Sequence, residues 1–186
     1  MPASPSTATS GTDHIPEDDV PEHVERATVA LPPRDRTRLG LPEGSGTAID
    51  PTALPPLDDG QWADPEVVAV RFVLVRTNYR ADEDPAALRA RSIPYVVPRL
   101  GAELAWSSGG QAGLAELRAQ GAVFAGDVVA VTTTERSHNR SVVDLTVQRS
   151  TSVDGEPRPA QVSFWRLTLV RDVASGPWQV ADLQLS

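Results

Sequence analysis

The residues best suited to chemistry are an aspartate, an arginine and a second aspartate on three successive predicted strands. Asp144, Arg166 and Asp182 occupy the same phase of the strand alternation, so hairpins in register place Arg166 between the two acids. Such a ladder either fixes strand register on a solvated or half-buried face or lines a pocket together with Tyr79. In the pocket, burial raises the pKa of one carboxyl while Arg166 keeps the other ionised, as general acid and base chemistry requires.

Other kinds of chemistry have little support in the residues. The 186-residue chain contains no cysteine, which excludes disulfides, thiolate nucleophiles and cysteine-bound metals. Three histidines, His14, His23 and His138, are too few for a histidine-rich metal centre, and His138 falls in a predicted polar turn. Nucleophile-elbow, phosphate-loop and dinucleotide glycine patterns do not occur. We therefore expect no catalytic set, no metal and no cofactor.

Charge argues against a nucleic-acid partner. The 17 basic residues are all arginine, and with 25 acidic residues the net charge is −8. A nucleic-acid binder normally shows a basic stripe. The complete lack of lysine suits a GC-rich coding sequence, such as an actinobacterial one.

The second half of the folded region reads as an antiparallel meander. Apolar and polar residues alternate along four segments, and polar or Gly/Pro-containing breaks separate them. The four predicted strands span 124–134, 141–150, 160–171 and 178–185. Consecutive strands with short connections pair as neighbours.

Alternation divides the strand residues into two faces. One set is apolar, and the other mixes charged, polar and apolar side chains. The first is Val143, Leu145, Val147, Trp165, Leu167, Leu169, Ala181, Leu183 and Leu185; the second is Val142, Asp144, Thr146, Phe164, Arg166, Thr168, Val180 and Asp182, with Trp178 at its edge. Whichever face lacks helices is expected to associate with other proteins. The residues expected to form that interface are Trp165, Leu167, Leu169, Leu183, Leu185 and Trp178.

Helices are predicted before the strands. Asp64 followed by Pro65 is a strong helix start, and the first helix is expected to run to about Tyr79. Further helices are predicted over 85–93, from Pro98, and over 111–120. The fold class is therefore α+β, with N-terminal helices packed on a curved four-stranded antiparallel sheet.

Residues 1–63 read as a disordered, acidic, proline-rich tail, with the domain at 64–186. The tail holds 10 of the 17 prolines, and 11 acidic residues against four arginines. No signal peptide is predicted, and the longest apolar stretch, Val67 to Val75, is interrupted by Arg71 and far too short to span a bilayer. Membrane association is expected only through a partner or an anchor absent from this sequence. These features favour the cytoplasm.

The closing segment Gly176-Pro-Trp-Gln-Val-Ala-Asp-Leu183 resembles the last-strand signature of the nuclear-transport-factor-like superfamily, whose cystatin-like fold is a cone. The resemblance covers about residues 64–186. Within that superfamily, Pro94-Tyr-Val-Val-Pro-Arg-Leu-Gly-Ala-Glu-Leu104 resembles actinobacterial TcpC-like conjugative-transfer and Mce-associated proteins.

This resemblance implies a non-catalytic scaffold of a conjugation, type IV secretion or export apparatus, outside the cell membrane, with protein partners and a homo-oligomeric state. Those families usually carry an N-terminal membrane helix, which this sequence lacks. The alternative is a SnoaL-like or ketosteroid-isomerase-like pocket enzyme, or an apolar-ligand-binding protein. In that alternative Asp182, four residues after Trp178, faces the pocket with Asp144 and Arg166, and Tyr79 donates to an oxyanion.

Overall fold

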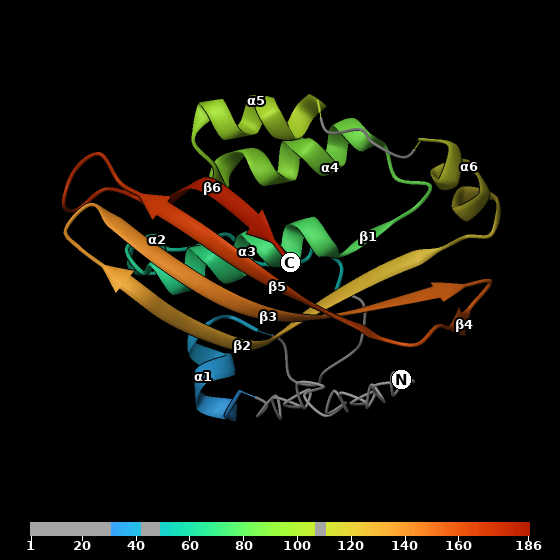
Figure 1. The fold of residues 1–186 in the computed structure, drawn as a ribbon, viewed down its shortest axis with the longest axis horizontal. Coiled ribbons are helices and arrows are strands. Elements are labelled where there is room, and N and C mark those ends of the chain that lie inside the picture. The colour runs from blue at the N-terminus through green and yellow to red at the C-terminus, as the bar shows by residue number, and fades with distance from the viewer. Residues whose placement is uncertain (1–30, 42–48, 107–110) are drawn as a thin grey trace, which may run out of the picture.

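A long antiparallel sheet curls around one central helix in the computed structural model, which describes residues 31–41, 49–106 and 111–186 (Figure 1). The central helix, α3 (Pro65–Thr77), begins at Asp64, whose carboxylate accepts a hydrogen bond from the Glu66 N–H at 2.9 Å. Nearly every residue of α3 is buried, including Arg71. A helix that is apolar on all sides must be covered on all sides, and this requirement organises the rest of the fold.

The sheet covers one side of α3. Its strands are β1 (Tyr79–Arg80), β2 (Val123–Arg136), β3 (Arg140–Val153), β5 (Gln161–Val170) and β6 (Gln179–Leu185), hydrogen-bonded in that order, and β4 (Glu156–Pro157) pairs with β3. All these pairs are antiparallel. The four predicted strands are confirmed. The two additional strands have two residues each, too short for alternation to reveal.

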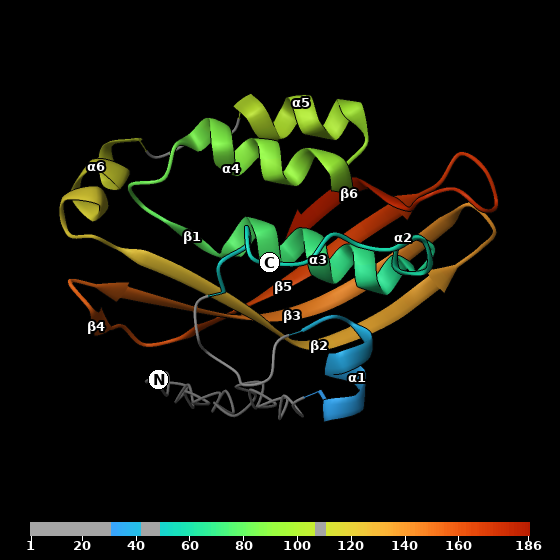
Figure 2. The ribbon, with the colours of Figure 1, turned by 180° about the vertical axis from the view of Figure 1, so that it is seen from behind.

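Smaller helices complete the domain. They are α4 (Pro85–Ser92), a 3-10 turn (Ile93–Tyr95), α5 (Pro98–Trp106) and α6 (Gln111–Ala119). In both ribbon views α4 and α5 lie together on the far side of α3 from β2 and β3, and α6 lies at the end of the sheet near β4 (Figure 2). The predicted α+β class is confirmed.

The prediction that residues 1–63 form a disordered tail is wrong for the described part of that region. Residues 31–41 and 49–63, here called the strap, contain α1 (Pro33–Arg38) and α2 (Asp59–Trp62). Leu39, Leu41 and Leu57 from the strap are buried in the same core as α3. The strap is needed because the sheet leaves part of the apolar α3 uncovered. The rest of the predicted tail lies outside the described residues.

Ion pairs attach α1 to the domain. The Arg36 guanidinium donates to both carboxylate oxygens of Asp127 on β2, at 3.0 and 3.3 Å, and Asp127 is only 5% exposed. Arg38 pairs with Asp64 at 3.0 Å and with Glu66 at 2.6 Å, at the start of α3. A buried carboxylate needs its partner, so α1 belongs to the folded unit.

The end of α3 is held by a buried amide. The Asn78 side chain donates to the carbonyls of Leu74 and Gly126 at 3.0 and 2.9 Å, and its oxygen accepts from the N–H groups of Ile49 and Gly126 at 3.1 and 3.3 Å. A Cβ at Gly126 would overlap the Thr77 side chain. Glycine at this position therefore lets α3 approach β2 closely.

Candidate interaction surface on the sheet

The apolar face of the sheet packs on α3, contrary to the predicted interface. Trp165, Leu167, Leu169 and Trp178 are at most 7% exposed and belong to the core, and Leu183 is partly buried against it. Of the six predicted interface residues, Leu185 alone is largely exposed, at 61%. Alternation separates the two faces of a strand, but it does not say which face a helix covers. A helix as apolar as α3 takes the apolar face.

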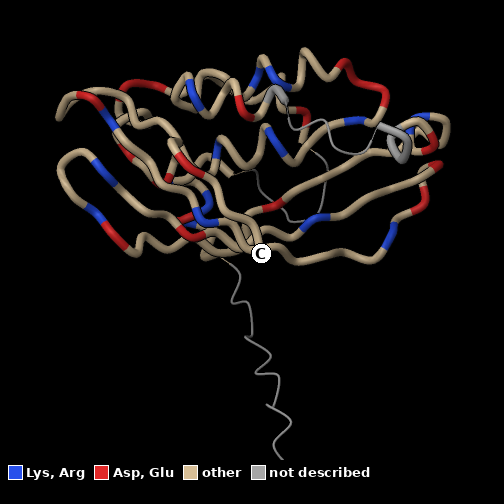
Figure 3. The backbone as a smooth tube through the Cα atoms, turned by 45° about the horizontal axis from the view of Figure 1, so that its top comes forward, with Lys and Arg blue, Asp and Glu red and all other residues tan. Residues whose placement is uncertain are grey.

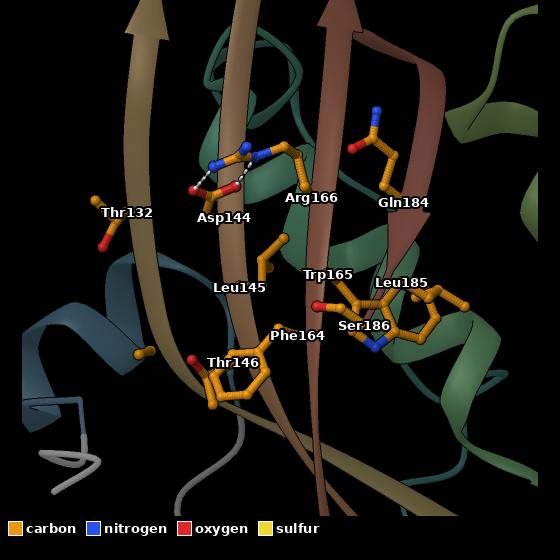
Figure 4. A pocket seen from close by; sticks show the side chains of 11 residues that line it. Thr132, Asp144, Leu145, Thr146, Phe164, Trp165, Arg166, Gln184, Leu185 and Ser186 are labelled. Carbon is orange, nitrogen blue, oxygen red and sulfur yellow. Dashed lines mark hydrogen bonds and ion pairs between the residues drawn. The ribbon is translucent and has the colours of Figure 1, made fainter. Parts of the chain in front are cut away.

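The opposite face of the sheet, here called the outer face, carries Thr132, Asp144, Thr146, Phe164, Arg166 and Gln184. Figure 4 shows these side chains on the side of the strands turned away from α3. They line an open hollow of about 650 Å³, with Leu185 and Ser186 at one side. Phe164 is 48% exposed, and Val162, two residues earlier on β5, is 53% exposed. Large apolar side chains exposed beside a hollow are typical of a protein-binding surface.

Asp144 and Arg166 face each other across β3 and β5, as predicted. Two hydrogen bonds of 2.7 Å join the Arg166 guanidinium to the two carboxylate oxygens. The hydrogen bonds from Arg166 lower the pKa of Asp144 below its usual value, although partial burial acts in the opposite direction. The Asp144 carboxylate is therefore held in its ionised form by Arg166. A general acid at neutral pH needs the opposite, a raised pKa.

The third member of the predicted ladder does not join this pair. In the register of β5 and β6, Asp182 lies opposite Thr168 and Arg166 lies opposite Gln184, and a one-residue bulge at Ala181 shifts the pairing before Asp182. The Asp182 carboxylate accepts a hydrogen bond from the Gln184 side chain at 3.3 Å. The same bulge places Val180, predicted on the mixed face, in the core opposite Leu169. One extra residue in a strand reverses its alternation.

Tyr79 lies in a different part of the molecule. Its ring stacks on Phe124 with centroids 4.5 Å apart, and it lines a second hollow of about 550 Å³ with Arg80, Glu83 and Arg91. Burial raises the pKa of the Tyr79 hydroxyl, although nearby arginines act against it.

The pocket predicted for the enzyme alternative is therefore not assembled. Phe124 pairs with both Tyr79 and Thr151, and Thr151 is seven residues along β3 from Asp144. At ~3.3 Å per residue, Tyr79 and Asp144 are separated by about 23 Å along the sheet. A tyrosine and a carboxylate at that separation cannot act on one substrate atom.

Phe164 and Val162 are the surface residues that sequence reasoning missed. The strand alternation places Phe164 on the mixed face, whereas the predicted interface lies on the fully apolar one. The sequence signal for their exposure was a large apolar side chain on the same strand face as charged residues. The mixed face of such a sheet is the one that faces water.

Acidic and basic residues are interspersed along the described chain (Figure 3). Within the described residues, no group of His, Asp and Glu could hold a metal ion. No described helix has the length and apolar character needed to cross a membrane.

Comparisons with known proteins give likenesses in fold. No protein-family model matches the chain, and no curated protein matches its sequence. Agrobacterium tumefaciens VirB8 matches at 16% identity and a TM-score of 0.47, over 71% of this chain and 96% of VirB8. CagV of Helicobacter pylori, a VirB8 homolog of a type IV secretion system, matches at 9% identity and a TM-score of 0.43, over 63% of this chain and 92% of CagV.

An Ntf2-like protein involved in plasmid conjugation matches at 12% identity and a TM-score of 0.40, over 64% of this chain and 46% of its own. The likeness to nuclear-transport-factor-like conjugative-transfer proteins that the sequence predicts is therefore confirmed at the level of fold. Its actinobacterial part is not tested by these structures and stays a prediction. At this identity the likeness concerns the fold, a curved antiparallel sheet around a helix, and not the role.

Proposed function

We propose that this chain is a non-catalytic scaffold domain of a conjugative-transfer or export apparatus, and that it binds other proteins through the outer face. The observation that carries the proposal is the exposure of Val162 and Phe164, 53% and 48%, beside the hollow on that face. Thr132, Arg166 and Gln184 on this face are exposed as well. Exposed aromatic anchors beside a hollow are where binding energy concentrates in protein interfaces.

The outer face has the composition of a protein interface. Phe164 supplies apolar area on this face, Leu185 borders the hollow from the other face of β6, and Thr132, Thr146 and Gln184 supply polar groups around it. The bidentate Asp144–Arg166 pair presents its charges already neutralised. A partner can therefore cover the face without leaving an unpaired charge, the main cost of burying ionic groups. We infer a partner surface with an aliphatic or aromatic side chain that enters the hollow.

The same geometry favours binding over catalysis. Asp144 is the only carboxyl side chain that lines the outer hollow among the described residues, and Arg166 holds its pKa low. General acid and base pairs require two titratable groups whose environments separate their pKa values. The second candidate carboxylate, Asp182, hydrogen-bonds to Gln184 instead.

The type of apparatus is inferred from the sequence resemblance around 94–104 and 176–183. VirB8, CagV and the conjugation protein named above have similar folds, but at TM-scores below 0.5 their roles are not transferred to this chain.

The proposal is tested by placing a charge on the outer face. In cells that encode this chain, Phe164→Asp should lower plasmid transfer or export at least ten-fold, while the purified variant keeps the wild-type melting temperature. The matched control is Ile93→Asp, at another exposed apolar residue (59%) between α4 and α5, which should leave transfer unchanged. Unchanged transfer in the Phe164 variant, or equal loss in both variants, would contradict the proposal.

A further inference from the structure

The last strand of the sheet has an open edge. β6 ends the strand order and pairs with β5 alone. Phe164 and Ser186 exchange both backbone hydrogen bonds, at 3.0 and 3.1 Å. In an antiparallel pair such bonded positions alternate, so Gln184 and Asp182 also direct their backbone groups toward β5. The N–H and C=O groups of Leu183 and Leu185 therefore point away from the sheet.

The chain covers only the beginning of this edge. Val96 bridges to Val180, and the Val97 N–H donates to the Val180 carbonyl at 3.0 Å. Past Val180, no described residue supplies a backbone partner to the outer edge of β6. Leu185, near the end of the strand, is 61% exposed.

The sequence does little to protect this edge. Proteins usually guard exposed edges with lysine, proline or a bulge within the free segment. The bulge in β6 is at Ala181, and the free segment beyond it reads Asp182-Leu-Gln-Leu185. Asp182 is its only charged residue. An edge of this kind is suited to receive another strand.

We infer that a second copy of this chain adds its β6 antiparallel to β6, with the two Leu183 residues paired at the two-fold axis. This inference rests on the proposed function, since it assumes that the domain acts by association, and it names one partner and its site. The two Leu183 residues would exchange both backbone hydrogen bonds, because each directs its N–H and C=O outward. Two curved sheets would then form one continuous sheet.

The side chains in this register match on both faces. On the outer face, each Gln184 lies opposite Asp182 of the second copy, an amide donor against a carboxylate acceptor. These groups already form a hydrogen bond within one strand, at 3.3 Å. On the other face Leu183 meets its own copy. No two like charges face each other, as a self-complementary two-fold interface requires.

The absence of cysteine makes a direct test possible. In the full chain, Leu183→Cys should form a disulfide-linked dimer on mild oxidation, since bonded antiparallel pairs have Cα atoms about 5.5 Å apart, within the range of a disulfide. Leu185→Cys is the matched control. Its two copies lie four residues apart in this register, about 13 Å, and should remain unlinked.

A second pair of variants avoids the partly buried Leu183. Gln184→Lys should tighten the dimer at least three-fold, because lysine meets Asp182 of the second copy, and Gln184→Glu should weaken it at least three-fold. Sedimentation equilibrium of the full chain gives both dissociation constants.

A wild-type chain that stays monomeric at millimolar concentration overturns the inference. So does linking at position 185 in preference to 183, or a dimer that responds to neither change at position 184. Protection of the Leu183 amide only when a different protein is added would show that the strand comes from another chain. The proposed function fails separately, through the Phe164→Asp result.

Discussion

Leu39→Ala distinguishes a packed strap from a disordered tail. Leu39 is 1% exposed and lies in the core with α3. Truncating a fully buried leucine costs about 2–5 kcal/mol, through lost transfer free energy and the cavity left behind. For a domain of this size each kcal/mol lowers the melting temperature by about 2–4 °C, so the expected fall is about 4–20 °C. In a disordered tail the same change would cost nothing.

Urea denaturation and calorimetry of the full chain measure this effect. The control is Ile93→Ala, which removes the same number of atoms from a residue that is 59% exposed and should change the unfolding free energy by less than about 0.5 kcal/mol. A Leu39→Ala variant within that same limit of the wild type would refute the packed strap. A fragment that begins at Asp64 should likewise lose cooperative unfolding, while one that begins at Leu31 should keep it.

Three further predictions follow from the contacts of the strap and of α3. Arg36→Met leaves the Asp127 carboxylate buried without its partner and should lower the free energy of unfolding in urea by about 3–5 kcal/mol. Adding Asp127→Asn should recover part of this loss. No recovery in the double variant would contradict the pairing. Burial alone raises the pKa of Glu66, but the Thr133 hydrogen bond and the ion pair with Arg38 outweigh it and lower that pKa. The stabilisation by Glu66 is therefore present above its unfolded pKa of about 4.5 and is lost as pH falls through the lower folded value. Glu66→Gln should lower the melting temperature at pH 7 and flatten its fall below pH about 4.5; parallel curves for variant and wild type would count against this. Gly126→Ala should cost about 1–3 kcal/mol by overpacking against Thr77, and an unchanged urea midpoint would exclude that contact.

Local signals predicted most of the fold. Asp64 and Pro65 mark the start of α3 as the structure has it, and the alternation after Gly121 predicts the four long strands. In both cases the deciding chemistry, a helix cap or a strand face, lies within a few neighbouring residues.

The strap could not be predicted in this way. Leu39, Leu41 and Leu57 are single leucines among prolines and acidic residues, without periodicity. These leucines are ordered because they pack on the side of α3 that the sheet leaves uncovered, and α3 lies further along the chain. Composition indicates how much apolar surface a segment can bury by itself. It does not indicate whether another element provides an apolar surface on which the segment can pack.

The site was only half predictable for a related reason. Asp144 and Arg166 pair because β3 and β5 keep a regular register, whereas Asp182 pairs with Thr168 and a one-residue bulge in β6 turns Val180 into the core. No residue type marks that bulge in the sequence. The choice of the covered face depends on α3, so the predicted interface fell on Leu167 and Leu169, which are core residues.

The most direct test of the central claim is site-specific crosslinking from the outer face in living cells. A photoreactive phenylalanine analogue at position 164 should give a discrete product with a protein subunit of a transfer or export apparatus encoded beside this chain. The same analogue at position 93 should not. Absence of any such product from position 164, or the same product from both positions, would contradict the account.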